Sequence, residues 1–67
     1  MPIVTVELME GRSLDQKRAL ALHLTDAVVN SLAVARETVQ VHIAEMSRDN
    51  VAIGGVLQAE TPPNVVP

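Results

Sequence analysis

Hydrophobic and polar residues alternate with a period of two in two stretches of the chain, residues 3–8 and 37–46. A period of two is typical of a strand with one buried face and one open face. Each stretch therefore predicts a strand. The residues on the two predicted buried faces are Val4, Val6, Leu8, Val39, Val41 and Ile43. The opposite faces carry a mixed, only partly polar set: Ile3, Thr5, Glu7, Gln40, His42 and Ala44.

Residues 14–32, between the two predicted strands, follow the period of a helix. Ser13 and Gln16 are spaced as in a capping box, in which both side chains satisfy backbone N–H groups at the start of a helix. At about 100° per residue, one apolar stripe faces the sheet. This stripe contains Leu20, Leu24, Ala27, Val28 and Leu32. Leu22 and Val29 fall roughly opposite the stripe, where they are either exposed side chains or a subunit contact.

The order strand, helix, strand predicts a right-handed β-α-β unit with a parallel strand pair. Asp49-Asn50 and Gly54-Gly55 are turn signals around two short apolar runs, residues 51–53 and 56–57, which predicts a small C-terminal β-hairpin. Three prolines among residues 58–67 predict an extended tail. The predicted fold class is α+β, with residues 1–67 as a single domain.

The composition indicates that this domain is incomplete as a monomer. A chain of 67 residues buries only about 60% of the surface that its unfolded form exposes, and two strands alone are not stable in water. The chain has no cysteine, so we expect no disulfide framework, and its two histidines are isolated, so we expect no structural metal site. Since 48% of the residues are hydrophobic, we expect oligomerisation through the sheet edges and the open face.

The charge pattern argues against several classes of partner. The net charge is −3, the five lysines and arginines form no basic stripe, and no aromatic residue is present to stack on a base, so nucleic-acid binding is not expected. No apolar run approaches the roughly 18 residues that span a bilayer, and the N-terminus lacks the features of a signal peptide. We therefore expect a soluble cytoplasmic protein that acts on a small molecule, without a membrane partner or a cofactor.

The dipeptide Met1-Pro2 is the first candidate for chemistry. A small second residue normally allows removal of the initiator methionine, which would leave Pro2 with a free secondary amine. An α-amino group titrates near 7.7–8.0, and burial in an apolar site disfavours its charged form, so this amine would serve as a general base or a nucleophile. If Met1 is retained, the Pro2 nitrogen is an amide without basicity.

Several short motifs occur together with this proline. Pro2-Ile3 opens the chain, Leu-Met-Glu-Gly-Arg-Ser occupies residues 8–13, and Ile-Gly-Gly occupies residues 53–55, with Gln16-Lys17 and Glu45-Met46 between them. From about Pro2 to Leu57 the chain resembles the 4-oxalocrotonate tautomerase family, whose short members are β-α-β units with an N-terminal catalytic proline. The resemblance implies assembly as a hexamer, a trimer of dimers, which agrees with the expected oligomerisation.

The resemblance also implies roles for four residues. Pro2 would be the general base that moves a proton between carbons of a dienol or enone acid, which gives the keto tautomer. Arg12 would bind or polarise the carboxylate end of the substrate. Met9 and Ile53 would line an apolar wall that keeps the pKa of the proline amine low.

The chain departs from the family pattern at two of the predicted substrate-binding positions. Gln40 stands where the family has a second arginine, and Val51 stands at the position of an aromatic wall residue. A carboxamide forms neutral hydrogen bonds only, whereas a guanidinium grips a carboxylate with two charged ones. The loss is about 1.5–3 kcal/mol, which corresponds to roughly 10- to 100-fold in rate. We therefore expect a wider pocket and weaker activity on dicarboxylates.

Two further side chains leave alternatives open. Arg36 lies four residues before Gln40 and is either a surface arginine or a second cation that reaches the site from the loop. His42 shares the open strand face with Gln40, and it is either a histidine at a subunit interface or a substrate contact and second acid.

The function that the sequence favours is an isomerase that acts on a small unsaturated 2-hydroxy or 2-oxo acid such as 2-hydroxymuconate. The first alternative is a weakly catalytic or non-catalytic subunit of a hetero-oligomer, in which a partner chain supplies the missing arginine and aromatic residue. The second is a proline-dependent hydratase-dehalogenase or decarboxylase, in which Glu7 or His42 would be the acid/base partner. A homohexamer is the expected assembly of the isomerase, and a heterohexamer that of the subunit.

Overall fold

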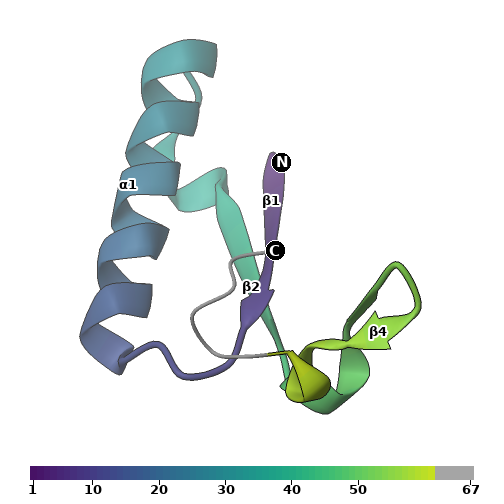
Figure 1. Cartoon of the computed structure of the whole chain (residues 1–67). Coiled ribbons are helices and arrows are strands. Elements are labelled where there is room, and N and C mark those ends of the chain that lie inside the picture. Colours follow the sequence, from purple (N-terminus) through teal and green to yellow (C-terminus); the bar gives the residue numbers. More distant parts are fainter. Residues whose placement is uncertain (62–67) are drawn as a thin grey trace.

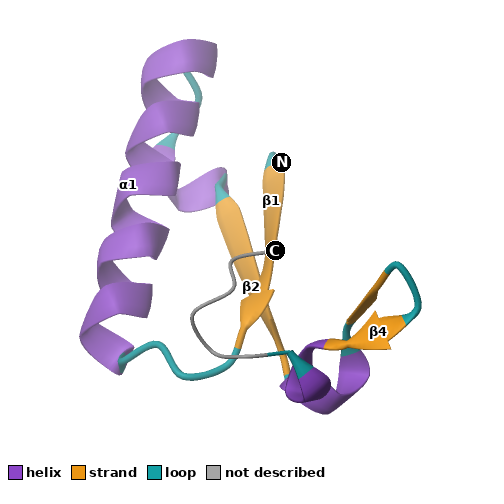
Figure 2. Cartoon of the chain, viewed as in Figure 1, coloured by secondary structure: helices purple, strands orange, loops and turns teal. Residues whose placement is uncertain are grey.

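The computed structural model of the chain describes residues 1–61. Strand β1 (Ile3–Met9) is followed by helix α1 (Leu14–Leu32) and strand β2 (Gln40–Met46). Two short strands, β3 (Ala52–Ile53) and β4 (Val56–Leu57), complete the regular structure, and short 3₁₀ turns lie before and after β2 and after β4 (Figure 2). The order and type of these elements confirm the predicted α+β fold.

The two long strands form a parallel pair whose register runs from Ile3 opposite Gln40 to Met9 opposite Met46. Helix α1 connects them and lies along one face of the pair, while the other face is open (Figure 1). Burial follows the predicted alternation in both strands, because the apolar positions toward the helix are half-buried and the intervening positions are exposed. The β-α-β unit and the assignment of its two faces are therefore confirmed.

Helix α1 begins and ends at the predicted residues. The Ser13 hydroxyl accepts a hydrogen bond from the Gln16 N–H (3.1 Å), and the Ser13 N–H donates to Gln16 Oε1 (3.0 Å), so both halves of the capping box are formed. At the other end, Ala33 adopts a left-handed conformation (φ 54°), and its N–H donates to the Val29 carbonyl (3.0 Å).

The predicted sheet-facing stripe of α1 is correct only in part. Leu20, Leu24 and Val28 are half-buried, whereas Ala27 is exposed and Leu32 is 60% exposed. Ala21, Thr25 and Val29 are also half-buried, so Val29 is not the exposed side chain that the pattern predicted for a single chain. Short side chains contribute little to a hydrophobic pattern even where they face a sheet, and for that reason the pattern placed the stripe off-centre. Leu22 is 53% exposed, as expected.

Two segment boundaries also differ from the prediction. Strand β2 begins at Gln40 and not at residue 37, because Arg36–Thr38 form a 3₁₀ turn in which both the N–H and the hydroxyl of Thr38 donate to the Ala35 carbonyl. Gln58–Glu60 form another 3₁₀ turn where an extended tail was predicted. The remainder of the predicted tail, residues 62–67, lies outside the described residues.

The β3–β4 hairpin lies at the end of the sheet away from the N-terminus (Figure 1). Its antiparallel register pairs Ala52 with Leu57 and Ile53 with Val56. The turn residues Gly54 and Gly55 have φ angles of 61° and 84°, as in a type I′ turn, which requires a positive φ at both central residues and which Gly-Gly adopts readily. The predicted hairpin is thus confirmed.

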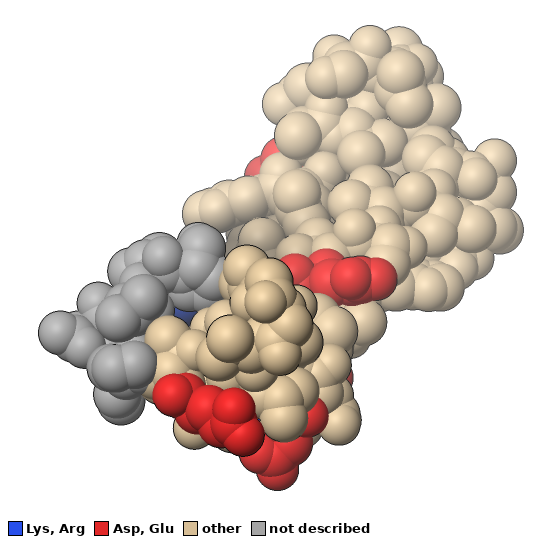
Figure 3. Space-filling model, turned by 45° about the vertical axis from the view of Figure 1, so that its right-hand side comes forward, with Lys and Arg blue, Asp and Glu red and all other residues tan. Residues whose placement is uncertain are grey.

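The described residues contain no buried hydrophobic side chain, and Gln58, at 4% exposure, is the one buried residue. The Cα radius of gyration is 15.1 Å, against about 11 Å for a compact domain of this length. Much of the surface on the side shown in Figure 3 is neither acidic nor basic, and the acidic groups there form separate spots. No helix within residues 1–61 has the length and apolar character needed to cross a membrane.

Candidate active site

Pro2 lies directly before β1, at the end of the sheet opposite the hairpin. It is half-buried, and its carbonyl accepts a hydrogen bond from the Gln40 N–H (3.0 Å). This bond continues the ladder between β1 and β2 by one step beyond Ile3. The lack of an N–H on proline causes no loss here, because the first residue of a strand is a position where a ladder donor is not required.

The side chains of Gln40 and His42 lie on the open face of the sheet, next to the N-terminus. His42 Nε2 is 3.1 Å from Gln40 Oε1, and Gln40 Nε2 is 2.9 Å from the sulfur of Met1. Met1, Pro2, Gln40 and His42 therefore form one group, which we call the N-terminal cluster. The sequence predicted that Gln40 and His42 share a face, but it did not reveal the contact between Gln40 and Met1.

Arg12 lies at the other end of the molecule, in the loop between β1 and α1. It is exposed, and it borders a shallow pocket of about 200 Å³ that is also lined by Leu8, Gln16, Lys17 and Leu20. The ammonium group of Lys17 pairs with Glu45 at 2.7 Å, whereas Arg12 takes part in no ion pair with residues 1–61. The Arg12 guanidinium is thus an uncompensated cation that faces solvent.

The other predicted wall residues lie at this same end. Met9 is the last residue of β1, opposite Met46. Val51 precedes the hairpin, where its carbonyl accepts from the Gln58 N–H (2.7 Å), and Ile53 is 52% exposed in β3. We call Met9, Arg12, Val51 and Ile53 the far-end group.

A single chain does not bring the N-terminal cluster and the far-end group together. Pro2 and Met9 are seven residue steps apart along one extended strand, which corresponds to about 23 Å at 3.3 Å per residue. Pro2 and Arg12 therefore cannot contact the same small molecule within one chain. The linear sequence did not show this separation, because strand direction and register determine it.

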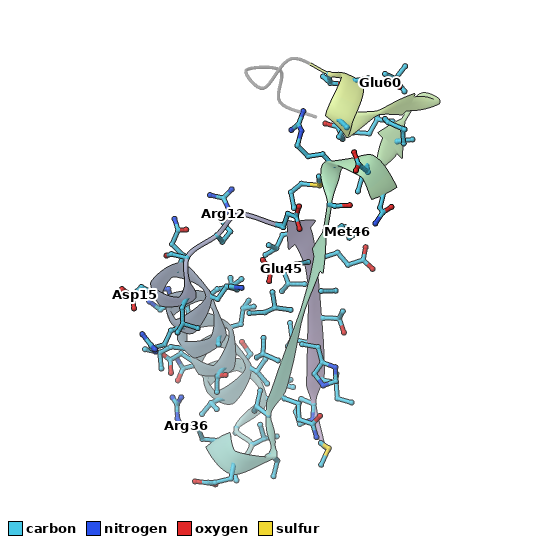
Figure 4. All side chains as sticks on the ribbon, turned by 90° about the horizontal axis from the view of Figure 1, so that it is seen from below. Arg12, Asp15, Arg36, Glu45, Met46 and Glu60 are labelled. Atoms are coloured by element: carbon cyan, nitrogen blue, oxygen red, sulfur yellow. The ribbon has the colours of Figure 1, made fainter. Side chains whose placement is uncertain are left out.

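Arg36 is on the end of α1 opposite Arg12 (Figure 4) and pairs with Asp26 of the helix. This pairing directs the guanidinium toward α1. Of the two alternatives for Arg36, it favours a surface arginine over a second cation that reaches the site. Glu7, the other candidate acid/base residue, is exposed on the open face opposite Ala44. Residues 1–61 contain no group of three or more side chains suited to hold a metal ion.

A family model described as "Tautomerase enzyme" matches residues 2–60 of the chain. The chain belongs to the tautomerase family. The probable tautomerase lin2709 of Listeria innocua serovar 6a is 40% identical over 60 residues, which cover 90% of this chain and 98% of that protein. The family that the short motifs indicated is therefore confirmed.

Solved structures of this family have the same fold. A crystal structure of TTHB242, a 4-oxalocrotonate tautomerase homologue, superposes with a TM-score of 0.87 at 37% identity and covers 92% of this chain and 98% of its own. A heterohexameric 4-oxalocrotonate tautomerase from Chloroflexus aurantiacus J-10-fl superposes with a TM-score of 0.85 at 31% identity and covers 92% of this chain and 100% of its own.

Proposed function

We propose that this tautomerase-family chain is an isomerase in which the amine of Pro2 is the general base and the substrate is a small unsaturated 2-hydroxy or 2-oxo acid. The observation that carries the proposal is the position of Pro2, half-buried at the start of β1 and beside the polar side chains of Gln40 and His42. Removal of Met1 converts the Pro2 nitrogen from an amide to a basic amine.

The chemistry is a proton transfer without change in composition. The free amine takes a proton from the substrate, electrons shift along the conjugated system, and the protonated amine returns a proton to a different atom. The broken C–H or O–H bond is replaced by a new C–H bond, so the product is an isomer. A positioned general base contributes typically 10²- to 10⁴-fold to such a transfer.

In this proposal each site is shared between chains. Pro2, Gln40 and His42 come from one chain, and Arg12 comes from another with the rest of the far-end group. The Arg12 guanidinium would bind the substrate carboxylate with two charged hydrogen bonds. The exposed apolar side chains of the isolated chain support the proposed homohexamer, since assembly would cover them.

One observation favours a second candidate function, that of a subunit in a hetero-oligomer. Within residues 1–61, the N-terminal cluster contains no arginine or lysine, and the nearby Arg36 is already paired with Asp26. A partner chain of the same family would supply the cation that this cluster lacks. The similar structure from Chloroflexus aurantiacus is a heterohexamer of this kind of chain.

The test compares proteins that differ only at the N-terminus. Intact mass establishes whether Met1 is absent from the purified chain, and ketonisation of 2-hydroxymuconate is then followed by absorbance. We expect activity from the chain that begins at Pro2, and a loss of about 10²- to 10⁴-fold for Pro2→Ala. A short peptide extension on the N-terminus abolishes activity, whereas the same extension on the C-terminus is the matched control and leaves it intact.

Full activity with the Pro2 nitrogen acylated would disprove the proline mechanism. If an active protein forms only after the chain is mixed with a second chain of the family, the proposed assembly is the hetero-oligomer and not the homohexamer. Inactivity of the chain beginning at Pro2, alone and in such mixtures, on both 2-hydroxymuconate and its monocarboxylate counterpart 2-hydroxypenta-2,4-dienoate would remove both proposals.

A further inference from the structure

The carboxamide of Gln40 is held in one orientation by its neighbours. Its oxygen can only accept, so His42 Nε2, at 3.1 Å, must carry the proton of that hydrogen bond. With the oxygen occupied, the amide nitrogen of Gln40 faces the start of the chain, where it donates to the Met1 sulfur at 2.9 Å. The order of contacts is therefore His42 to Gln40 to Met1.

The Met1 sulfur marks the place where an acceptor from a ligand would lie. A thioether is a weak acceptor, and Met1 is 82% exposed, so this contact contributes little to stability. When Met1 is removed, the side-chain amide of Gln40 loses this partner. The hydrogen bond from the Gln40 backbone N–H to the Pro2 carbonyl (3.0 Å) still holds Gln40 beside Pro2. A hydrogen-bond donor is then presented next to the proline amine.

This donor is neutral, and its surroundings determine which ligand group it suits. The Gln40 carboxamide carries no charge, and Arg36 at the same end of the sheet pairs with Asp26. A carboxylate that moves there from water loses hydration without gaining an ion pair, whereas an uncharged carbonyl or a hydrocarbon end loses much less. The free guanidinium of Arg12 belongs to the far-end group, which a second chain would contribute.

We infer that the Gln40–His42 pair makes the site selective for monocarboxylates. In this inference, which rests on the proposed function, Arg12 of a second chain binds the single carboxylate and Gln40 faces the uncharged end of the unsaturated acid. His42 is a positioning residue, because it acts by fixing the Gln40 carboxamide with its N–H groups toward the substrate.

The first test compares two substrates that differ by one carboxylate, 2-hydroxypenta-2,4-dienoate and 2-hydroxymuconate. The unmodified chain has the higher kcat/KM on the monocarboxylate, and Gln40→Arg shifts the ratio of the two kcat/KM values toward the dicarboxylate by about 10- to 100-fold. Asn30→Arg adds the same charge on the exposed side of α1 and is the matched control, which leaves the ratio unchanged.

The second test separates positioning by His42 from a merely structural role. His42→Leu removes the donor, so the carboxamide rotates freely and the preference for the monocarboxylate falls several-fold, mainly through KM. His42→Gln retains an N–H donor and restores the preference. In the Gln40→Leu background, His42→Leu has no further effect on the ratio, because the two side chains act as one unit.

Inhibition of the unmodified chain by pentanoate and hexanedioate is a check that needs no variant, and we expect pentanoate to inhibit at the lower concentration. The inference is overturned if hexanedioate inhibits better, or if the substrate ratio stays constant in correctly assembled Gln40→Arg and His42→Leu proteins. Such results leave the proposed function intact as long as Pro2→Ala still abolishes turnover. Turnover that does not depend on Pro2 removes both.

Discussion

Ser13 connects the local structure of the chain with its candidate chemistry. Its hydroxyl and its N–H form the two hydrogen bonds of the capping box with Gln16, and Arg12 is the residue immediately before it. The cap therefore fixes the backbone from which the Arg12 side chain extends. Only a side chain that accepts a hydrogen bond can do this, since the first N–H groups of a helix lack partners within the helix.

Ser13→Ala removes that acceptor and should lower the free energy of unfolding by about 1 kcal/mol. It should also raise KM more than it lowers kcat, because Arg12 is held less firmly. Ser31→Ala, in the exposed last turn of α1, is the control, and helix propensity predicts little change or a small gain there. Denaturant titration at one protein concentration measures both variants. Equal stability of the two would show that the cap contributes nothing.

The sequence sufficed to predict those residue-level features that depend on near neighbours. The capping box spans four residues, and the two glycines of the hairpin are adjacent, so both features were predictable from local rules. The contact between Gln40 and Met1 joins residues 39 positions apart. It depends on the register of two strands, which no local pattern determines.

The hairpin is held in place by one long side chain from the segment before it. The Arg48 guanidinium donates to the carbonyls of Gln58 and Thr61, the latter at 2.8 Å. The Gln58 N–H donates in turn to the Val51 carbonyl at 2.7 Å. These bonds close a loop around β3 and β4, and they position the candidate wall residues Val51 and Ile53 at the end of β2. The sequence predicted only a turn at Asp49-Asn50.

Arg48→Met keeps the aliphatic stem but removes the donors that bind the two carbonyls. We expect a loss of about 1 kcal/mol in stability and faster proteolytic cleavage between residues 48 and 61. Arg48→Lys recovers only part of this, because one ammonium does not reproduce the planar fork of a guanidinium. Arg18→Met is the control, since Arg18 pairs with Asp15 in an exposed salt bridge of small value. Unchanged proteolysis of Arg48→Met would contradict the anchoring role.

At the scale of whole elements, the sequence predicted the type and order of each helix and strand, and the differences lie at the ends of segments. Helix α1 occurs at the predicted residues, and β1 and the hairpin differ from the prediction by one residue at an end, whereas β2 begins three residues later and part of the predicted tail is a turn. Both differences involve a few backbone hydrogen bonds at a segment end, such as that from Thr38 to Ala35. The side of α1 that faces the sheet was also shifted, because Ala21 and Thr25 carry little hydrophobic signal.

At the scale of the whole molecule, residues 1–61 of the isolated chain lack a buried hydrophobic core and bring together only part of the proposed site. None of the described hydrophobic side chains is buried, and the chain extends over 43 × 24 × 15 Å. The same elongation places the N-terminal cluster and the far-end group at opposite ends of the sheet. Assembly would therefore complete the hydrophobic core and the site together, so loss of the oligomer should abolish activity even where the chain remains partly folded.

Subunit mixing tests the shared site directly. Pro2→Ala and Arg12→Ala should each be nearly inactive, because each lacks one member of every site. When the two are refolded together, random assembly places an intact Pro2 beside an intact Arg12 in about one quarter of the sites, and activity recovers to about that fraction.

A mixture of Pro2→Ala with the double variant Pro2→Ala/Arg12→Ala is the matched control, since it contains no intact Pro2 and should stay inactive. Mass spectrometry of the intact assemblies verifies that the chains have mixed. No recovery in fully mixed assemblies would mean that Pro2 and Arg12 must come from one chain. The chain would then have to bend so that the two ends of β1 meet, which the continuous pairing of β1 with β2 from Ile3 to Met9 opposes.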